Sequence, residues 1–350
     1  MSGSMREATG EELRIVVAAD GSGDCRSIQE AVDSIPPDFS RRTSIRVRAG
    51  VYREKLFIDR DRVSLIGEGA EKTVIRYGDH ATKTFPNGEP YHTFHSFTAL
   101  IGGDDFVAEG VSFVNDAGPG NEVGQAVAAY VDGDRAVFRR CRFEGCQDTL
   151  FTGPLPLRPV DRATFGGPRE GAPRRPSRQY YENCYIEGDV DFIFGSATAV
   201  FDRCEIFSKR LAGRPEERQD RTHGWITAAS TPEDAACGYV FLDCRLSGDA
   251  PPASVYLGRP WREFAQTVFI RCEMGAHIKP EGWHDWGKTG ARKTVRYAEY
   301  GSVGPGASTE RAEWSRRLTA AEAETFAPER VLAGEDGWNP RAIAAKSANE

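Results

Sequence analysis

The stretch Phe138-Arg139-Arg140-Cys141-Arg142-Phe143 belongs to a pattern that the chain repeats. The pattern is an aromatic residue, two further residues, a cysteine, one residue and an apolar residue. It returns at 181–186, 201–206, 241–246 and 269–274. Residues at equivalent positions of a repeat stack on one another, so we expect these five cysteines to form an inward ladder of small apolar side chains.

The spacing of the repeat predicts the fold. Its cysteines, Cys141, Cys184, Cys204, Cys244 and Cys272, lie 43, 20, 40 and 28 residues apart. We interpret this as coils of roughly 20 to 28 residues, with one coil unmarked by a cysteine and one coil enlarged. Short β-rich runs with glycine turns, also at 63–67 and 107–113, predict an all-β fold of the right-handed parallel β-helix type.

Helices are expected only at the two ends of this solenoid. Ser27 and Glu30 form a capping box, Ile28 begins an apolar helix face, and Pro36 follows the helix. This N-terminal helix would cover the open end of the solenoid. A second stretch, from about Thr319 to Arg330, predicts a C-terminal helical tail that packs back onto the coils.

The chain reads as one β-helix domain over 13–340 with two irregular ends. Residues 1–12 are expected to be disordered or a cloning remnant, and 341–350 a flexible tail. Residues 153–178, with six Pro and six Arg, predict an excursion from one coil. We expect that excursion to be either a solvated loop or a lid that engages carboxylates.

Composition excludes several classes of function. The 350 residues are 39% hydrophobic and 28% charged, which is typical of a soluble globular protein with a sizeable core. The net charge of -7 and the lack of a long basic run argue against nucleic-acid binding. No apolar run is long enough for a membrane span. We also expect the protein to be a monomer. The missing secretory signal favours the cytoplasm, or a secreted protein whose signal has been removed.

Neither the cysteines nor the histidines predict a metal site. The eight cysteines lack the paired spacing of zinc ligands, and the six histidines are scattered. We therefore expect no metal and no cofactor. Disulfides remain possible, although reduced thiols in the core are favoured.

Two carboxylates lie in apolar, strand-like sequence. The stretches are Gln147-Asp148-Thr149-Leu150 and Asp191-Phe192-Ile193-Phe194-Gly195. Aspartate is rarely buried without a partner, so both carboxylates are candidates for chemistry. Without the excursion they are about one coil apart, which would place them side by side. Two neighbouring carboxyl groups have different pKa values, so one can keep its proton and act as an acid while the other is ionised and acts as a nucleophile.

Further motifs in the same order carry a family resemblance. They are Gly50-Val51-Tyr52-Arg53-Glu54, Arg178-Gln179-Tyr180-Tyr181 and Leu257-Gly258-Arg259-Pro260-Trp261. With the two Asp motifs, they make the chain resemble the pectin methylesterases, especially bacterial ones, from Val16 to Pro340. The resemblance implies a pectin-lyase-like solenoid that hydrolyses galacturonate C6 methyl esters in pectin or methylated oligogalacturonides and releases methanol.

The resemblance also implies roles for particular residues. Asp191 would be the nucleophile, oriented by Arg259, and Asp148 the general acid and then base. Gln147 and Gln125 would stabilise the oxyanion. The expected substrate-binding residues are Thr93, Trp261, Val190, Phe194 and Met274.

Two departures from the family pattern and two alternative functions accompany this hypothesis. Position 189 is usually Thr but is Asp189 here, which could repel an anionic sugar or shift the pH optimum. The excursion is longer than in plant members, and its arginines could offset that charge. The alternatives are a β-helix esterase or thioesterase on a non-pectin substrate, and a non-catalytic polysaccharide-binding β-helix.

Overall fold

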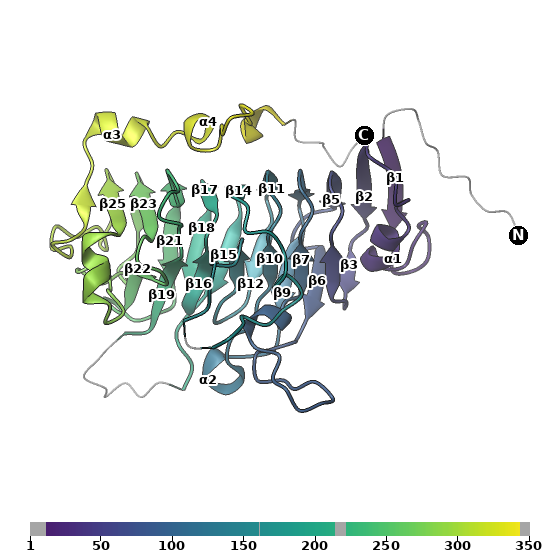
Figure 1. The fold of residues 1–350 in the computed structure, drawn as a ribbon, viewed down its shortest axis with the longest axis horizontal. Coiled ribbons are helices and arrows are strands. Elements are labelled where there is room, and N and C mark those ends of the chain that lie inside the picture. The colour runs from purple at the N-terminus through teal and green to yellow at the C-terminus, as the bar shows by residue number, and fades with distance from the viewer. Residues whose placement is uncertain (1–11, 161, 214–221, 344–350) are drawn as a thin grey trace, which may run out of the picture.

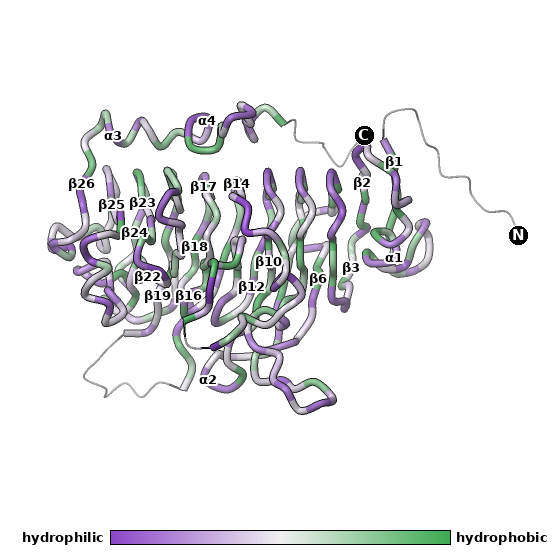
Figure 2. Tube along the Cα trace, in the orientation of Figure 1, coloured by the Kyte–Doolittle hydropathy of each residue, from purple (hydrophilic) through white to green (hydrophobic). Residues whose placement is uncertain are grey.

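The computed structural model describes residues 12–160, 162–213 and 222–343. Within these residues the chain winds into a solenoid whose strands form three parallel sheets along its length (Figure 1). Figure 2 shows hydrophobic and hydrophilic stretches alternating along the coils, as expected when strands turn one face inward. The expected parallel β-helix is confirmed.

Each sheet takes one strand from successive coils. Sheet A contains β1 (Glu12–Val17), β2 (Arg42–Val47), β5 (Val63–Gly67), β8 (Val107–Glu109), β11 (Ala136–Arg139), β14 (Arg178–Glu182), β17 (Thr198–Asp202), β20 (Tyr239–Leu242), β23 (Gln266–Ile270), β25 (Arg296–Tyr300) and β26 (Arg316–Arg317). Sheet B contains β3 (Gly50–Tyr52), β6 (Thr73–Tyr77), β9 (Ser112–Asn115), β12 (Arg142–Glu144), β15 (Tyr185–Gly188), β18 (Glu205–Ser208), β21 (Arg245–Gly248) and β24 (Glu273–Met274). Sheet C contains β4 (Leu56–Ile58), β7 (Ala99–Ile101), β10 (Ala129–Val131), β13 (Leu150–Thr152), β16 (Val190–Gly195), β19 (Gly224–Ala229) and β22 (Val255–Pro260).

The cysteine repeat marks the turn from sheet A to sheet B. The residue before each cysteine adopts a left-handed backbone, with φ between 49° and 54°, at Arg140, Asn183, Arg203, Asp243 and Arg271. Asn and Asp tolerate this conformation better than most residues, whereas Arg must be held there by its surroundings. One left-handed residue per coil turns the chain inward, which places the cysteine in the core.

Aromatic rings and thiols stack in two ladders inside the solenoid. Tyr181 and Phe201 are nearly parallel, with ring centroids 4.8 Å apart, and Phe201 and Phe241 lie 4.5 Å apart. The thiols of Cys184 and Cys204 donate to the main-chain carbonyls of Phe138 and Tyr181, one coil earlier. All eight cysteines lie in the described residues and are free. The expected inward ladder of cysteine side chains is present.

One part of the spacing interpretation is wrong. We expected an unmarked coil within the 40 residues between Cys204 and Cys244. Instead, β18 pairs directly with β21, and the chain between them forms a single coil that contains β19 and β20. Long connections on both sides of β19 account for the extra length.

The N-terminal helix α1 (Ile28–Asp33) lies at the β1 end of the solenoid (Figure 1). Ser27 Oγ accepts the main-chain N–H of Glu30, whereas the Glu30 carboxylate accepts from Arg26 N rather than completing the box. Both oxygens of Glu54 accept main-chain N–H groups at the start of α1. The Gly-x-Tyr-x-Glu motif therefore anchors this helix to the coils.

The C-terminal segment packs against the outer face of sheet A. It contains α3 (Ala320–Glu324) and α4 (Pro328–Val331), which run back along the solenoid in Figure 1, and the short η3 (Pro340–Ala342). Leu332 is fully buried against this sheet. Arg341, which the sequence analysis placed in a flexible tail, pairs with Asp202 at 2.6 Å and with Glu329 at 2.7 Å. Residues 1–11 and 344–350, on which the other predictions for the two ends of the chain fall, lie outside the described residues.

Three short helices lie in connections: η1 (Thr93–His95), α2 (Gly120–Val123) and η2 (Thr289–Lys293). The excursion at 153–178 leaves sheet C after β13 and returns to sheet A at β14. Arg169 fixes it to the coils through ion pairs with Asp132 at 2.7 Å and Asp59 at 2.9 Å.

Candidate active site

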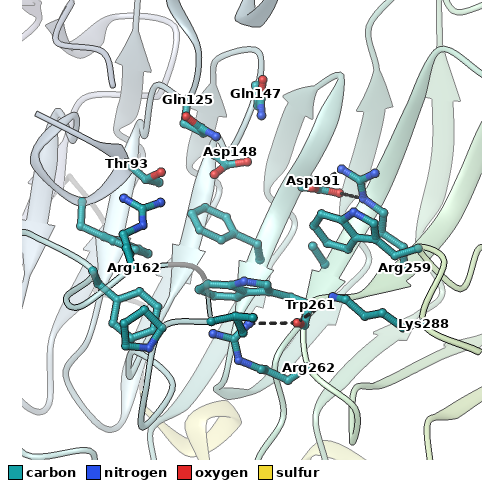
Figure 3. A pocket seen from close by; sticks show the side chains of 17 residues that line it. Thr93, Gln125, Gln147, Asp148, Arg162, Asp191, Arg259, Trp261, Arg262 and Lys288 are labelled. Atoms are coloured by element: carbon teal, nitrogen blue, oxygen red, sulfur yellow. Dashed lines mark hydrogen bonds and ion pairs between the residues drawn. The ribbon is translucent and has the colours of Figure 1, made fainter. Parts of the chain in front are cut away.

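A cavity of about 360 Å³ lies on the outer face of sheet C, where both aspartate motifs meet (Figure 3). Asp148 lies two residues before β13, and Asp191 is the second residue of β16. Leu150 pairs with Ile193, so Asp148 and Asp191 occupy equivalent positions of neighbouring coils. The main-chain N–H of Asp148 donates to the carbonyl of Val190 at 3.0 Å. The expected juxtaposition of the two carboxylates is present.

Both aspartates have left-handed backbones, with φ of 63° at Asp148 and 50° at Asp191. Such a conformation costs on the order of 1 to 3 kcal/mol for a residue with a side chain. The surrounding coils hold it, and both side chains are directed to the cavity although they are only 8% and 5% exposed. The strain therefore occurs at the two residues that are candidates for chemistry.

Arg259, from β22, holds Asp191 with two parallel hydrogen bonds. Its Nε lies 2.7 Å from Oδ1 and its Nη2 lies 2.6 Å from Oδ2. The guanidinium lies between two indoles, 3.9 Å from the ring centroid of Trp225 and 3.7 Å from that of Trp286. Fork-shaped pairing and stacking together fix the Asp191 carboxylate in one orientation.

The two carboxyl groups differ in their tendency to ionise. Burial and the nearby Asp191 charge raise the pKa of Asp148 well above its usual range. Burial also raises the pKa of Asp191, but the charge and hydrogen bonds of Arg259 oppose that rise. Asp148 has no cation bonded to it in the described part of the chain, so the shared environment favours a protonated Asp148 beside an ionised Asp191.

Two side-chain amides lie beside Asp148 (Figure 3). Gln147 immediately precedes it, and Gln125 follows α2 on the previous coil. The main-chain N–H of Ala126 donates to the carbonyl of Gln147 at 3.1 Å, which ties the two segments together. Both amides line the cavity, where their N–H groups can meet a developing negative charge.

Aromatic rings form the rest of the cavity. Trp261 stacks on Phe94, with centroids 6.4 Å apart and planes inclined by 24°. Phe194 packs near the indole, with ring centroids 5.8 Å apart, and Thr93 also lines the cavity. Trp261 is half-buried, and the part of its indole that lines the cavity suits the apolar face of a sugar ring.

Two expected substrate-binding residues do not line the cavity. Met274 is fully buried in the core, and the assignment to a subsite is wrong. It occupies the last position of the repeated pattern, which faces inward in every copy. Val190 is half-buried on β16, pairs with Trp225 and is absent from the cavity lining.

Three cations in the lining were not predicted: Arg162, Arg262 and Lys288. Lys288 Nζ donates to the carbonyls of Pro260 and Trp261 at 2.8 and 3.1 Å. Arg162 belongs to the excursion. The excursion lies between the two Asp motifs in the sequence, and that position could have indicated that its arginines reach the cavity. With Arg259, these residues make the cavity locally basic on a chain of net charge -7.

Among the described residues, no group of His, Cys, Asp or Glu side chains is arranged to hold a metal ion. None of the helices described here is long and apolar enough to cross a membrane.

A buried carboxylate pair, an arginine clamp and nearby amides lie together on a β-helix, an arrangement suited to ester hydrolysis, and the matches of the chain to pectinesterases place it among the carboxylic ester hydrolases. The family model for pectinesterase matches residues 14–155 and 165–335. Pectinesterase 31 of Arabidopsis thaliana is 36% identical over 323 residues, covering 89% of each chain. A pectinesterase of Petunia integrifolia is 34% identical, covering 93% of this chain and 81% of the relative. The chain belongs to the pectinesterase family.

Some relatives are longer than this chain. A probable pectinesterase/pectinesterase inhibitor 6 of Arabidopsis thaliana is 38% identical, and the chain spans 52% of its length. Among solved structures, the carrot pectin methylesterase matches with a TM-score of 0.77 and 32% identity, covering 95% of this chain and 97% of that one. A pectin methylesterase in complex with a hexasaccharide matches with a TM-score of 0.75 and 30% identity, covering 93% and 97%. These matches establish the right-handed parallel β-helix.

Proposed function

We propose that this chain hydrolyses the C6 methyl esters of galacturonate residues in pectin or methylated oligogalacturonides through Asp191 and Asp148. The observation that carries the proposal is the Arg259–Asp191 pair, which lies beside a buried Asp148 of raised pKa in a cavity that the Trp261 indole lines. A related pectin methylesterase binds a hexasaccharide, which supports an extended saccharide as the substrate.

The reaction begins with attack of an Asp191 carboxylate oxygen on the ester carbonyl carbon. The carbonyl oxygen gains negative charge, which the amides of Gln125 and Gln147 stabilise. Asp148 gives its proton to the departing methoxide, and methanol leaves. The product of this half-reaction is an anhydride between Asp191 and the sugar carboxyl group.

Water completes the cycle. The ionised Asp148 takes a proton from the water that attacks the sugar acyl carbon of the anhydride. The bond between that carbon and the Asp191 oxygen breaks, which frees the sugar carboxyl group, whose proton passes to solvent, and restores protonated Asp148 and ionised Asp191. Arg259 keeps Asp191 oriented through both steps, because its two hydrogen bonds would favour the carboxylate as leaving group.

Methanol release from methylated pectin tests this proposal. Wild-type protein should release methanol, and Asp191→Ala and Asp148→Ala should each lower kcat by at least about a thousandfold. The matched control is Asp243→Ala, which removes an aspartate whose ion pair with Arg271 lies on the surface. No methanol from wild-type protein at any pH from about 5 to 9 would favour the other-ester or non-catalytic alternatives.

The oligomeric state of the enzyme is also part of the proposal. We expect the active species to be a monomer. Size-exclusion chromatography with light scattering measures this directly.

A further inference from the structure

One wall of the active-site cavity comes from a segment that the pectinesterase family model does not match. The match stops at residue 155 and resumes at 165. From the part between, Pro159, Val160 and Arg162 line the cavity. This wall is therefore a feature of this chain rather than of the family pattern.

The excursion that carries this wall is fixed to the solenoid. Phe165 is 4% exposed and packs on Phe94 and Trp261, with ring centroids 5.7 and 6.2 Å apart. The Arg262 guanidinium donates to the carbonyl of Arg158 at 3.0 Å. The ion pairs of Arg169 hold the far side of the excursion. The wall therefore has a defined position relative to Trp261 and the carboxylate pair.

Four of the six arginines of the excursion are engaged. Arg169, Arg175 and Arg178 pair with aspartates, and Arg174 donates to main-chain carbonyls. Within the described residues, no hydrogen bond or ion pair engages Arg162, which lies in the cavity lining. Figure 3 shows its guanidinium beside Thr93, across the cavity from Arg259.

An unengaged guanidinium at this position selects a carboxylate. It presents a rigid fork of N–H donors that matches two carboxylate oxygens, whereas a methyl ester offers no charge and only weak acceptors. A polygalacturonate chain carries free carboxylates wherever its esters have already been removed. The guanidinium can therefore distinguish an esterified neighbour from a de-esterified one.

We propose that Arg162 binds the free carboxylate of a galacturonate residue next to the one being hydrolysed. The enzyme would thus favour partly de-esterified galacturonate chains over fully esterified ones. This inference rests on the proposed function, and it names the substrate class that the site prefers.

The test compares two methylated oligogalacturonides of equal length, one fully esterified and one with free carboxylates at alternate residues. Arg162→Ala should raise KM about five- to tenfold for the partly de-esterified substrate, since one charge-assisted contact is lost. It should leave kcat within about twofold and leave KM for the fully esterified substrate unchanged. Arg162→Lys should restore part of the preference.

Arg158→Ala is the matched control. It removes the same charge from the same segment, but Arg158 does not line the cavity, and its carbonyl contact with Arg262 is retained. Equal effects of Arg162→Ala on both substrates, or the same selective effect from Arg158→Ala, would overturn the inference.

A binding measurement separates this inference from the proposed function. Unesterified oligogalacturonate needs no catalysis, and its binding can be followed by tryptophan fluorescence. If wild-type protein binds it and Arg162→Ala weakens that binding severalfold, the inference stands even if no methanol is released. Unchanged binding in Arg162→Ala overturns it even if methanol release is normal.

Discussion

Asp148 and Asp191 carry the same chemical group in two different settings. Arg259 bonds both oxygens of Asp191, whereas burial next to a charged neighbour favours the neutral form of Asp148. The resulting difference in pKa allows one residue type to provide an acid and a nucleophile. The sequence predicted this pair because both aspartates lie in apolar strands, but the supporting indoles of Trp225 and Trp286 had no motif that would mark them.

Asp189 is a third buried carboxyl group that interacts electrostatically with the pair. It is 2% exposed, and its Oδ1 accepts the main-chain N–H of Val190 at 2.7 Å. Burial raises the pKa of Asp189 to about 6, while the charge of Lys209 opposes the rise. Cys146, Asp148 and Asp191 are its other titratable neighbours. Above that pKa the negative charge of Asp189 makes Asp148 harder to ionise.

Asp189→Asn should therefore move the alkaline limb of kcat/KM to lower pH, by up to about one unit. The limb reflects loss of the Asp148 proton, and removing the Asp189 charge lowers the pKa of Asp148. Asparagine keeps the acceptor for Val190 N–H. The control is Glu187→Gln, which changes a nearby carboxylate that pairs with Lys209. An alkaline limb that stays in place, or moves upward, would show that Asp189 does not act on Asp148.

At the scale of elements, one position per coil decides how the chain turns. The aromatic residue, the left-handed residue and the cysteine fix the corner between sheets A and B, so the repeat could be predicted from the sequence. The same pattern explains Met274, whose position faces the core in every copy. The long coil between Cys204 and Cys244 could not be predicted, because its connections carry no comparable periodicity.

The stacked rings should account for much of the stability of the coils. Phe201 is fully buried between Tyr181 and Phe241. Phe201→Ala should lower the free energy of unfolding by about 3 to 5 kcal/mol, because it removes a large side chain and leaves a cavity. Urea unfolding measures the change. Phe57→Ala is the matched control, since Phe57 is 38% exposed on β4, and equal losses in the two variants would contradict a stabilising ring ladder.

At the scale of the whole molecule, the C-terminal segment ties distant coils together. Arg178 pairs with Asp134 at 2.6 Å and with Asp336 at 2.5 Å, which links the start of β14 to the segment after α4. The sequence predicted a helical tail that packs back, but not these ion pairs, because each joins residues far apart in the chain. The excursion is likewise held by long-range pairs, so its role as a cavity wall required the three-dimensional structure.

Leu332→Ala tests the contribution of this segment. Leu332 is fully buried against sheet A, and its truncation should lower the free energy of unfolding by about 2 to 4 kcal/mol. Leu157→Ala provides the comparison, because Leu157 is 83% exposed and its truncation should change stability by less than about 0.5 kcal/mol. A Leu332 variant as stable as the wild type would mean that the C-terminal segment does not contribute to the stability of the coils.

The order in which the two carboxyl groups ionise tests the proposed chemistry most directly. Carbon-13 NMR of protein labelled at the aspartate side-chain carboxyl can follow both titrations, with Asp148→Asn and Asp191→Asn used to assign the two signals. We predict that Asp191 ionises at the lower pH and that Asp148 keeps its proton until a higher pH. If Asp148 ionised first, with Asp191 still protonated, the assignment of acid and nucleophile would be contradicted.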